Sequence, residues 1–150
     1  MTAITLNIND TDYEVMVDGG DMLVDTLRAL GFTSVKKGCD TGSCGVCSIL
    51  LDGKVIPSCS LFTMKAREHK ILTIDGIEEK AREIGHFLLE EGVDQCGFCT
   101  PGLIMSIVAM ENDLKVYTEE SIKHYLVGNL CRCTGYEGQL RAIKKYLEVS

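Results

Sequence analysis

Eight cysteines fall in two groups of four, and their spacing limits what this chain of 150 residues can fold into. The first group is a Cys-x4-Cys-x2-Cys run with a later fourth cysteine: Cys39, Cys44, Cys47 and Cys59. The second group joins a Cys-x2-Cys pair to a Cys-x-Cys pair: Cys96, Cys99, Cys131 and Cys133. No cysteine is left over, so each half of the chain can build one site with four thiolates.

Glycines interleave with the first group and give the backbone freedom to wrap around a cluster. Gly38, Gly42 and Gly45 alternate with the cysteines, so the loop can turn tightly and direct N–H groups at sulfur. The Cys-x4-Cys-x2-Cys run is the spacing of plant-type 2Fe-2S sites, and it is not a usual zinc spacing. We therefore predict that this group binds a 2Fe-2S cluster through its four thiolates.

The second group is less specific when its spacing is taken alone. A Cys-x2-Cys pair is also typical of zinc, so spacing leaves a structural zinc ion open here. A disulfide framework is disfavoured, because the N-terminal segment shows no secretory signal and disulfides belong to oxidising compartments. The three histidines, His69, His86 and His124, stand apart from both groups and exclude a Rieske-type centre.

Charge and motif content exclude several classes of function. The formal charge of −7 argues against nucleic acid and anionic membrane as partners. The longest apolar run, Leu103 to Met110, is too short for a membrane span, and without an export signal we expect the protein in the cytoplasm. The sequence has no nucleotide-binding glycine motif, P-loop or nucleophile elbow, so it predicts electron transfer rather than chemistry on a substrate.

The residue pattern changes near residue 76 and divides the chain in two. Alternating apolar and polar residues predict hairpins over 4–17 and 48–56 and a last strand over 71–74. Between the hairpins, Asp21 is a candidate N-cap for a helix that Gly31 ends. Four sets of apolar residues with helical spacing follow, typical of a bundle. The expected fold class is α+β, with domains at residues 1–76 and 77–150.

Two cysteines of the second group directly precede a candidate helix start. Thr100 and Thr134 each follow a cysteine and could cap a helix, and Pro101 suits the first helical position. Two helix N-termini would then face one cluster and stabilise its negative charge. Arg132 lies between two cysteines, and it is interpreted either as a charge that tunes the cluster or as a surface or partner contact.

Four stretches together resemble the small iron–sulfur subunit of the molybdenum hydroxylases, the xanthine dehydrogenase and aldehyde oxidoreductase family. They are VKKGCDTGSCGVC (35–47), IPSC (56–59), QCGFCTPG (95–102) and GNLCRCTGY (128–136). The second cysteine arrangement is specific to this family. The resemblance therefore favours a second 2Fe-2S cluster over zinc, with four ligands: Cys96, Cys99, Cys131 and Cys133.

The resemblance implies a plant-type ferredoxin β-grasp domain followed by a four-helix bundle around the second cluster. It also implies two partner chains, a large subunit with molybdenum on molybdopterin and a medium subunit with FAD. Single electrons would pass from the molybdopterin centre through both 2Fe-2S clusters to FAD. By position, Gln95 and Cys133 match residues that lie against the pterin, so Cys133 would be both an iron ligand and a pterin contact.

Two other functions are weighed against this one. A free-standing two-cluster ferredoxin should have a wholly polar surface, whereas a subunit should expose apolar patches. A structural zinc protein is the third possibility. Within the family, the stretch 35–42 favours the xanthine dehydrogenase branch, so xanthine or a related purine or N-heterocycle is the expected substrate. Nicotinate, aldehydes, carbon monoxide and aromatic acyl-CoA substrates remain open.

Overall fold

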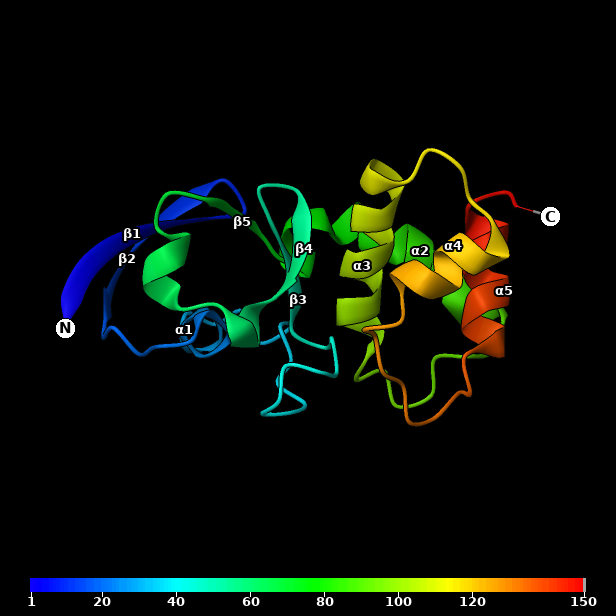
Figure 1. Cartoon of the computed structure of the whole chain (residues 1–150), viewed down its shortest axis with the longest axis horizontal. Coiled ribbons are helices and arrows are strands. Elements are labelled where there is room, and N and C mark those ends of the chain that lie inside the picture. Colours follow the sequence, from blue (N-terminus) through cyan, green and yellow to red (C-terminus); the bar gives the residue numbers. More distant parts are fainter. Residues whose placement is uncertain (150) are drawn as a thin grey trace.

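The N-terminal half of the chain is built on a five-stranded sheet in the order β2-β1-β5-β3-β4, seen in a computed structural model that describes residues 1–149 (Figure 1). The strands are β1 (Thr2–Ile8), β2 (Thr11–Val17), β3 (Ser48–Leu51), β4 (Lys54–Pro57) and β5 (Lys70–Leu72). β1 pairs parallel with β5, while β1–β2, β3–β4 and β3–β5 are antiparallel. Both predicted hairpins are confirmed, and the last strand ends before residue 74.

One α-helix and three short 3₁₀ segments complete the N-terminal half. Helix α1 (Leu23–Ala29) buries Leu23 and Leu27 in the core beneath the sheet. The 3₁₀ segments are η1 (Ser58–Ser60), η2 (Thr63–Ala66) and η3 (Ile74–Ile77).

The predicted cap of α1 is wrong. Met22 is the N-cap residue, and no side chain caps the helix. The carboxylate of Asp21 instead accepts a hydrogen bond of 2.8 Å from the N–H of Asp18. A carboxylate that is engaged in the preceding turn does not reach the free N–H groups of the helix.

The C-terminal half contains the four predicted helices: α2 (Glu78–Glu90), α3 (Thr100–Asp113), α4 (Glu119–Tyr125) and α5 (Glu137–Tyr146). Pro101 lies in the first turn of α3, as its second residue rather than the predicted first. Helix α3 is the central element, because it contacts α2 and α4 on one side and β3 and β4 on the other. None of these helices is long and apolar enough to cross a membrane, within the residues that the structure describes.

The two predicted threonine caps are also wrong. Thr100 is already the first residue of α3, and its hydroxyl donates to Asp94 Oδ1 at 3.0 Å. Helix α5 begins only at Glu137, and the hydroxyl of Thr134 donates to a cysteine sulfur instead. A cap forms when the hydroxyl oxygen of the residue before a helix accepts an N–H of its first turn. Thr100 is already inside α3, and Thr134 Oγ1 accepts at 3.3 Å from the N–H of Tyr136, which still precedes α5.

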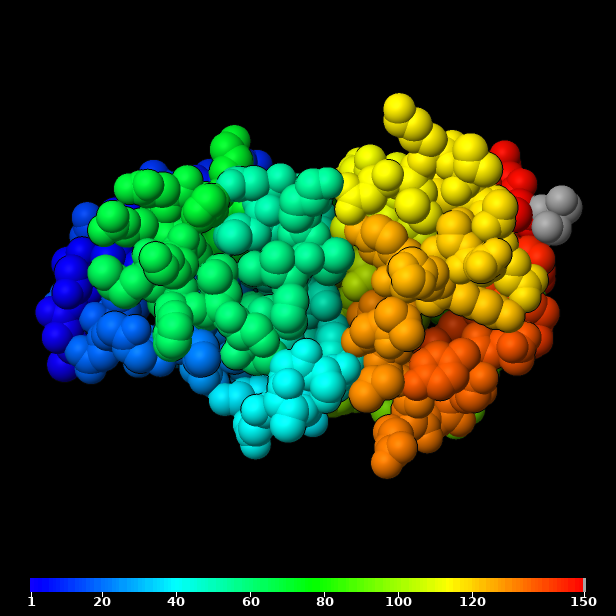
Figure 2. All heavy atoms as spheres, viewed as in Figure 1, coloured from blue at the N-terminus to red at the C-terminus, as the bar shows by residue number. Residues whose placement is uncertain are grey.

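The two halves share a small buried core. Leu50 of β3 packs with Met105 and Ala109 of α3, and all three are at most 2 % exposed. At the rim of this contact, Lys54 pairs with Asp113, which also accepts a hydrogen bond of 2.8 Å from Tyr125. The Lys54 ammonium is the main cause that lowers the pKa of Asp113. The lobes therefore meet along a packed seam (Figure 2).

Candidate metal centres

The first cysteine group is assembled by the loop before β3 and by the hairpin that follows it. Cys39, Cys44 and Cys47 lie on the loop between α1 and β3, and Cys59 lies in η1. The register of β3 and β4 pairs Ser48 with Pro57, which returns the chain to the loop. The N–H and hydroxyl of Ser58 then both donate to the carbonyl of Cys47, at 3.3 and 2.8 Å.

The sulfurs of this group are arranged in two pairs. Cys44 is the neighbouring thiol that acts on the pKa of Cys39, and Cys59 is the one that acts on the pKa of Cys47. The N–H of Thr41 is the main cause that lowers the pKa of Cys39 to about 6. Burial raises the pKa of the Cys47 thiol to about 11. Backbone N–H groups thus already stabilise a thiolate at Cys39, as a cluster loop requires.

The second cysteine group joins two loops of the helical half. Cys96 and Cys99 directly precede α3, while Cys131 and Cys133 lie between α4 and α5. Cys133 Sγ lies 3.6 Å from Cys96 Sγ, and Cys99 contacts Cys131 as the other pair. Cys96 and Cys133 are exposed. Cys99 and Cys131 lie deeper, and burial raises the pKa of Cys99 to about 12.

The paired arrangement fits a two-iron cluster, in which two metal ions share four thiolates. A structural zinc ion instead gathers its ligands tetrahedrally around one point. The chemistry of the donors, eight thiols in four pairs, therefore fits 2Fe-2S clusters in both groups.

Hydrogen-bond donors surround the sulfur of Cys131. The hydroxyl of Thr134 donates to it at 3.2 Å, and the N–H of Cys133 donates at 3.4 Å. Burial acts against ionisation here, but these donors together lower the pKa of Cys131. The N–H of Cys131 itself donates to the hydroxyl of Tyr136 at 3.0 Å, which closes the loop on itself.

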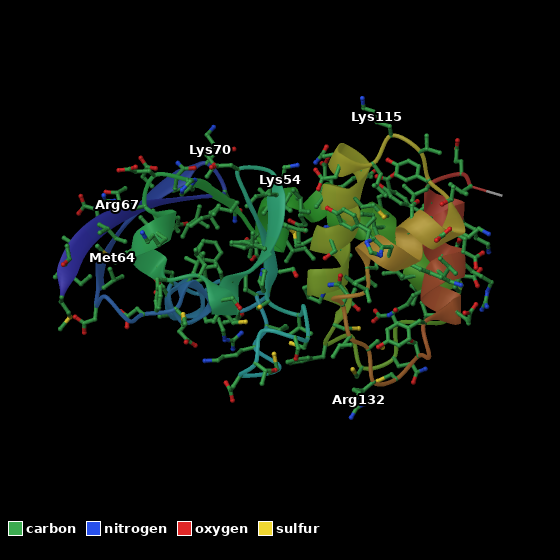
Figure 3. The ribbon with its side chains drawn as sticks, viewed as in Figure 1. Lys54, Met64, Arg67, Lys70, Lys115 and Arg132 are labelled. Carbon is green, nitrogen blue, oxygen red and sulfur yellow. The ribbon has the colours of Figure 1, made fainter. Side chains whose placement is uncertain are left out.

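Gln95 and Cys133, the two predicted pterin contacts, lie together at the surface. The side-chain amide of Gln95 donates to the carbonyl of Cys133 at 3.4 Å, and both residues are exposed. Arg132 is exposed as well, and Figure 3 shows its side chain pointing away from the molecule at the tip of its loop. This position fits a surface contact better than a charge that faces a cluster.

The loops that carry the two groups are joined across the seam. The N–H of Leu130, next to Cys131, donates to the carbonyl of Cys44 at 2.9 Å. The side-chain amide of Asn129 donates to the carbonyl of Gly45 at 3.4 Å. In Figure 2 the cyan loop near residue 40 touches the orange loop near residue 130. A cysteine of one group is thus one hydrogen bond away from the chain neighbour of a cysteine in the other.

Two residues at the second group were missed by the sequence reasoning. Tyr136 and Gln139 both contact the cysteine loops, through hydrogen bonds to Cys131 N–H and Cys99 Sγ. For Gln139 a signal existed, because this polar residue shares a helical face with the apolar Ile143 four residues later. The position of Tyr136 depends on the loop conformation, which helical periodicity does not describe.

Two sequence families match the chain, and between them they span most of it. Residues 6–73 match a "2Fe-2S iron-sulfur cluster binding domain", and residues 73–144 match a "[2Fe-2S] binding domain". The xanthine dehydrogenase iron-sulfur-binding subunit of Escherichia coli O157:H7 is 41% identical over 139 residues, which cover 89% of this chain and 87% of that protein. The chain belongs to the molybdenum hydroxylase family, as a small iron–sulfur subunit.

Other small iron–sulfur subunits are similar over nearly the same length. The nicotinate dehydrogenase small FeS subunit of Eubacterium barkeri is 38% identical over 136 residues, covering 89% of this chain and 87% of that protein. Among solved structures, a chain of quinoline 2-oxidoreductase from Pseudomonas putida 86 superimposes with a TM-score of 0.87 at 32% identity. That match covers 95% of this small iron–sulfur subunit and 90% of the other chain.

Proposed function

We propose that this small iron–sulfur subunit carries single electrons from a molybdopterin centre in a large partner subunit to FAD in a medium partner subunit. The eight cysteines would hold two 2Fe-2S clusters, and each cluster when bound would accept and release one electron at a time. We also assign residues 1–76 to a plant-type ferredoxin β-grasp domain and residues 77–150 to a four-helix bundle. The meeting of the two matched families at residue 73 supports that division.

The observation that carries the proposal is the hydrogen bond between the two cysteine loops. The N–H of Leu130 donates to the carbonyl of Cys44 at 2.9 Å, so the backbone offers a short route between the proposed ligands Cys131 and Cys44. The shared core of Leu50, Met105 and Ala109 keeps the two loops in a fixed relation. A chain whose two sites served unrelated purposes would have no need for this link.

The surface around the second cysteine group favours a subunit over a free-standing carrier. Large apolar side chains on its loops are exposed: Phe98 by 45 %, Val127 by 76 %, Leu130 by 44 % and Tyr136 by 44 %. Exposed apolar side chains that gather around a functional site are typical of a surface that a partner covers. We propose that the large subunit docks here, with Gln95 and Cys133 toward its pterin.

Small subunits that are 38% and 41% identical support a nitrogen heterocycle as the proposed substrate, whereas an aldehyde oxidoreductase is less similar, at 34%. Similar subunits belong, by name, to dehydrogenases of xanthine and of nicotinate. The substrate would bind in the large subunit, and the small subunit would only accept the electrons that the reaction releases there. We propose xanthine, a related purine or another N-heterocycle as the substrate class of the complex, and the cytoplasm as its location.

Anaerobic purification of the tagged chain from its own host tests this proposal. Iron, molybdenum, zinc and flavin would be quantified, and the accompanying chains identified. We expect about four irons per chain, two for each proposed cluster, with molybdenum, flavin and two larger chains. Four irons with neither molybdenum nor partners would instead point to a free-standing carrier. Zinc in place of iron would overturn both electron-transfer functions.

A further inference from the structure

Gln139 is a buried polar residue in an apolar setting. It is the third residue of α5, and only 7 % of its surface is exposed. Its neighbours include Leu103, Leu140 and Ile143, which line a cavity of about 390 Å³ with it. An amide in such surroundings is stable only if it finds a hydrogen-bond partner.

The partner of Gln139 is a sulfur of the second cysteine group. Its Nε2 donates to Cys99 Sγ at 3.9 Å, and this is the one hydrogen bond of its side chain within the described part of the chain. The distance is long, but N–H to sulfur contacts are longer than those to oxygen, and the low polarity of the surroundings strengthens them. A leucine or methionine would fill the same space without this donor.

We infer that Gln139 is a positioning residue that raises the reduction potential of the proposed helical-domain cluster through Cys99. The inference rests on the proposed function, because it requires a 2Fe-2S cluster on the second cysteine group. One added electron increases the negative charge that the thiolates share. A fixed N–H donor therefore stabilises the reduced form more than the oxidised form.

The donors around the second group are unevenly distributed. Cys131 receives the hydroxyl of Thr134, and Cys99 receives the amide of Gln139, so the deeper sulfur pair has a side-chain donor on each member. Cys96 and Cys133 form the exposed pair, closer to the proposed partner surface. Gln139 thus acts on the pair that includes Cys131. Cys131 follows Leu130, whose N–H donates to Cys44 in the other cysteine loop.

Redox titration of Gln139→Leu and Gln139→Met holoprotein, followed by electron paramagnetic resonance (EPR), tests the inference. We expect the ratio of reduced to oxidised helical-domain cluster at a fixed potential to fall several-fold, up to about tenfold, which is 59 mV for one electron. The ferredoxin-like cluster in the same sample is the internal control and should not shift. Equal shifts of both clusters, or no shift at full iron content, would overturn the inference.

A second measurement needs no variant of Gln139 and remains decisive if those variants lose iron. The chain has only two glutamines, Gln95 and Gln139. In Gln95→Met protein labelled with ¹⁵N at the glutamine side chain, a coupling of that nitrogen to the reduced helical-domain cluster is expected. If this coupling is absent from protein that shows both EPR signals, the result contradicts the inference about Gln139 but not the proposed function. A wild-type protein without iron–sulfur signals contradicts the proposed function instead.

Discussion

Tyr136 combines an unfavourable backbone conformation with a specific contact at the second cysteine group. Its φ of 74° lies in the left-handed region, which costs a side chain roughly 1 kcal/mol or more relative to glycine. Its hydroxyl accepts a hydrogen bond of 3.0 Å from the N–H of Cys131. Glycine would relieve the backbone but leave that N–H without its partner, so the contact offsets part of the strain of the left-handed backbone at Tyr136.

Replacing Tyr136 with phenylalanine should weaken the loop around the second cysteine group. The change removes one acceptor and leaves a part-buried N–H unpaired, which costs about 1–2 kcal/mol. We expect several-fold faster loss of iron to a chelator, followed by visible absorption. Tyr117→Phe is the matched control, because its hydroxyl donates to the Glu111 carbonyl at 3.4 Å, away from the cysteines. Equal rates in the two variants would contradict this role.

At the level of elements, the seam depends on glycines that let two backbones touch. A Cβ on Gly102, in the first turn of α3, would lie 2.3 Å from the carbonyl oxygen of Gly45 and 2.8 Å from Cα of Val46. A Cβ on Gly45 would lie 2.3 Å from the carbonyl oxygen of Gly128. Since both obstacles are backbone atoms, neither can move aside without shifting an element.

Gly102→Ala should therefore push the two halves apart. Overpacking of this kind costs typically about 1–3 kcal/mol, and here it should also lengthen the hydrogen bond from Leu130 to Cys44. The magnetic coupling between the two reduced clusters, read from EPR line shapes, is expected to weaken along with thermal stability. Gly85→Ala in α2 is the control, because its Cβ would meet nothing within 4 Å. That variant should be as stable as the wild type or slightly more so.

At the scale of the whole molecule, each lobe contains one of the two cysteine groups. Figure 1 shows the loop near residue 40 beneath the seam and the loops near residues 95 and 130 beneath the helical lobe. The exposed sulfurs of Cys96 and Cys133 and the exposed side chains of Phe98 and Val127 belong to the helical lobe. If the large subunit docks at that surface as proposed, its electrons would enter there before they reach the N-terminal half.

Cys133→Ser tests that order. Loss of one proposed ligand should damage the helical-domain cluster and cut transfer from the molybdenum centre by orders of magnitude. The ferredoxin-like EPR signal should persist, because its four ligands are untouched. Cys47→Ser is the reciprocal variant and should remove the other signal. Loss of the ferredoxin-like signal alone in Cys133→Ser would show that the cysteines had been grouped wrongly.

The cysteine groups and the helices could be predicted from the sequence better than the contacts between distant loops. Ligand spacing, periodicity and hairpin turns are local properties, so both cysteine groups and the four helices could be predicted from residues close in the chain. The bond between Leu130 and Cys44 joins loops more than eighty residues apart, and no local pattern encodes it. The predicted capping roles of Thr100 and Thr134 failed because the folded loops set the helix starts at other residues, Thr100 itself and Glu137.

The core that Leu50 shares with Met105 and Ala109 limits how this chain can be recombined. A break near residue 76 would leave an apolar face uncovered on the sheet and another on α3. Neither half is therefore a module that could be transplanted alone into an unrelated electron-transfer chain. A hybrid of two relatives would also have to match these side chains and the glycines beside them. The unit of exchange, for a designer or for evolution, is the pair of halves together.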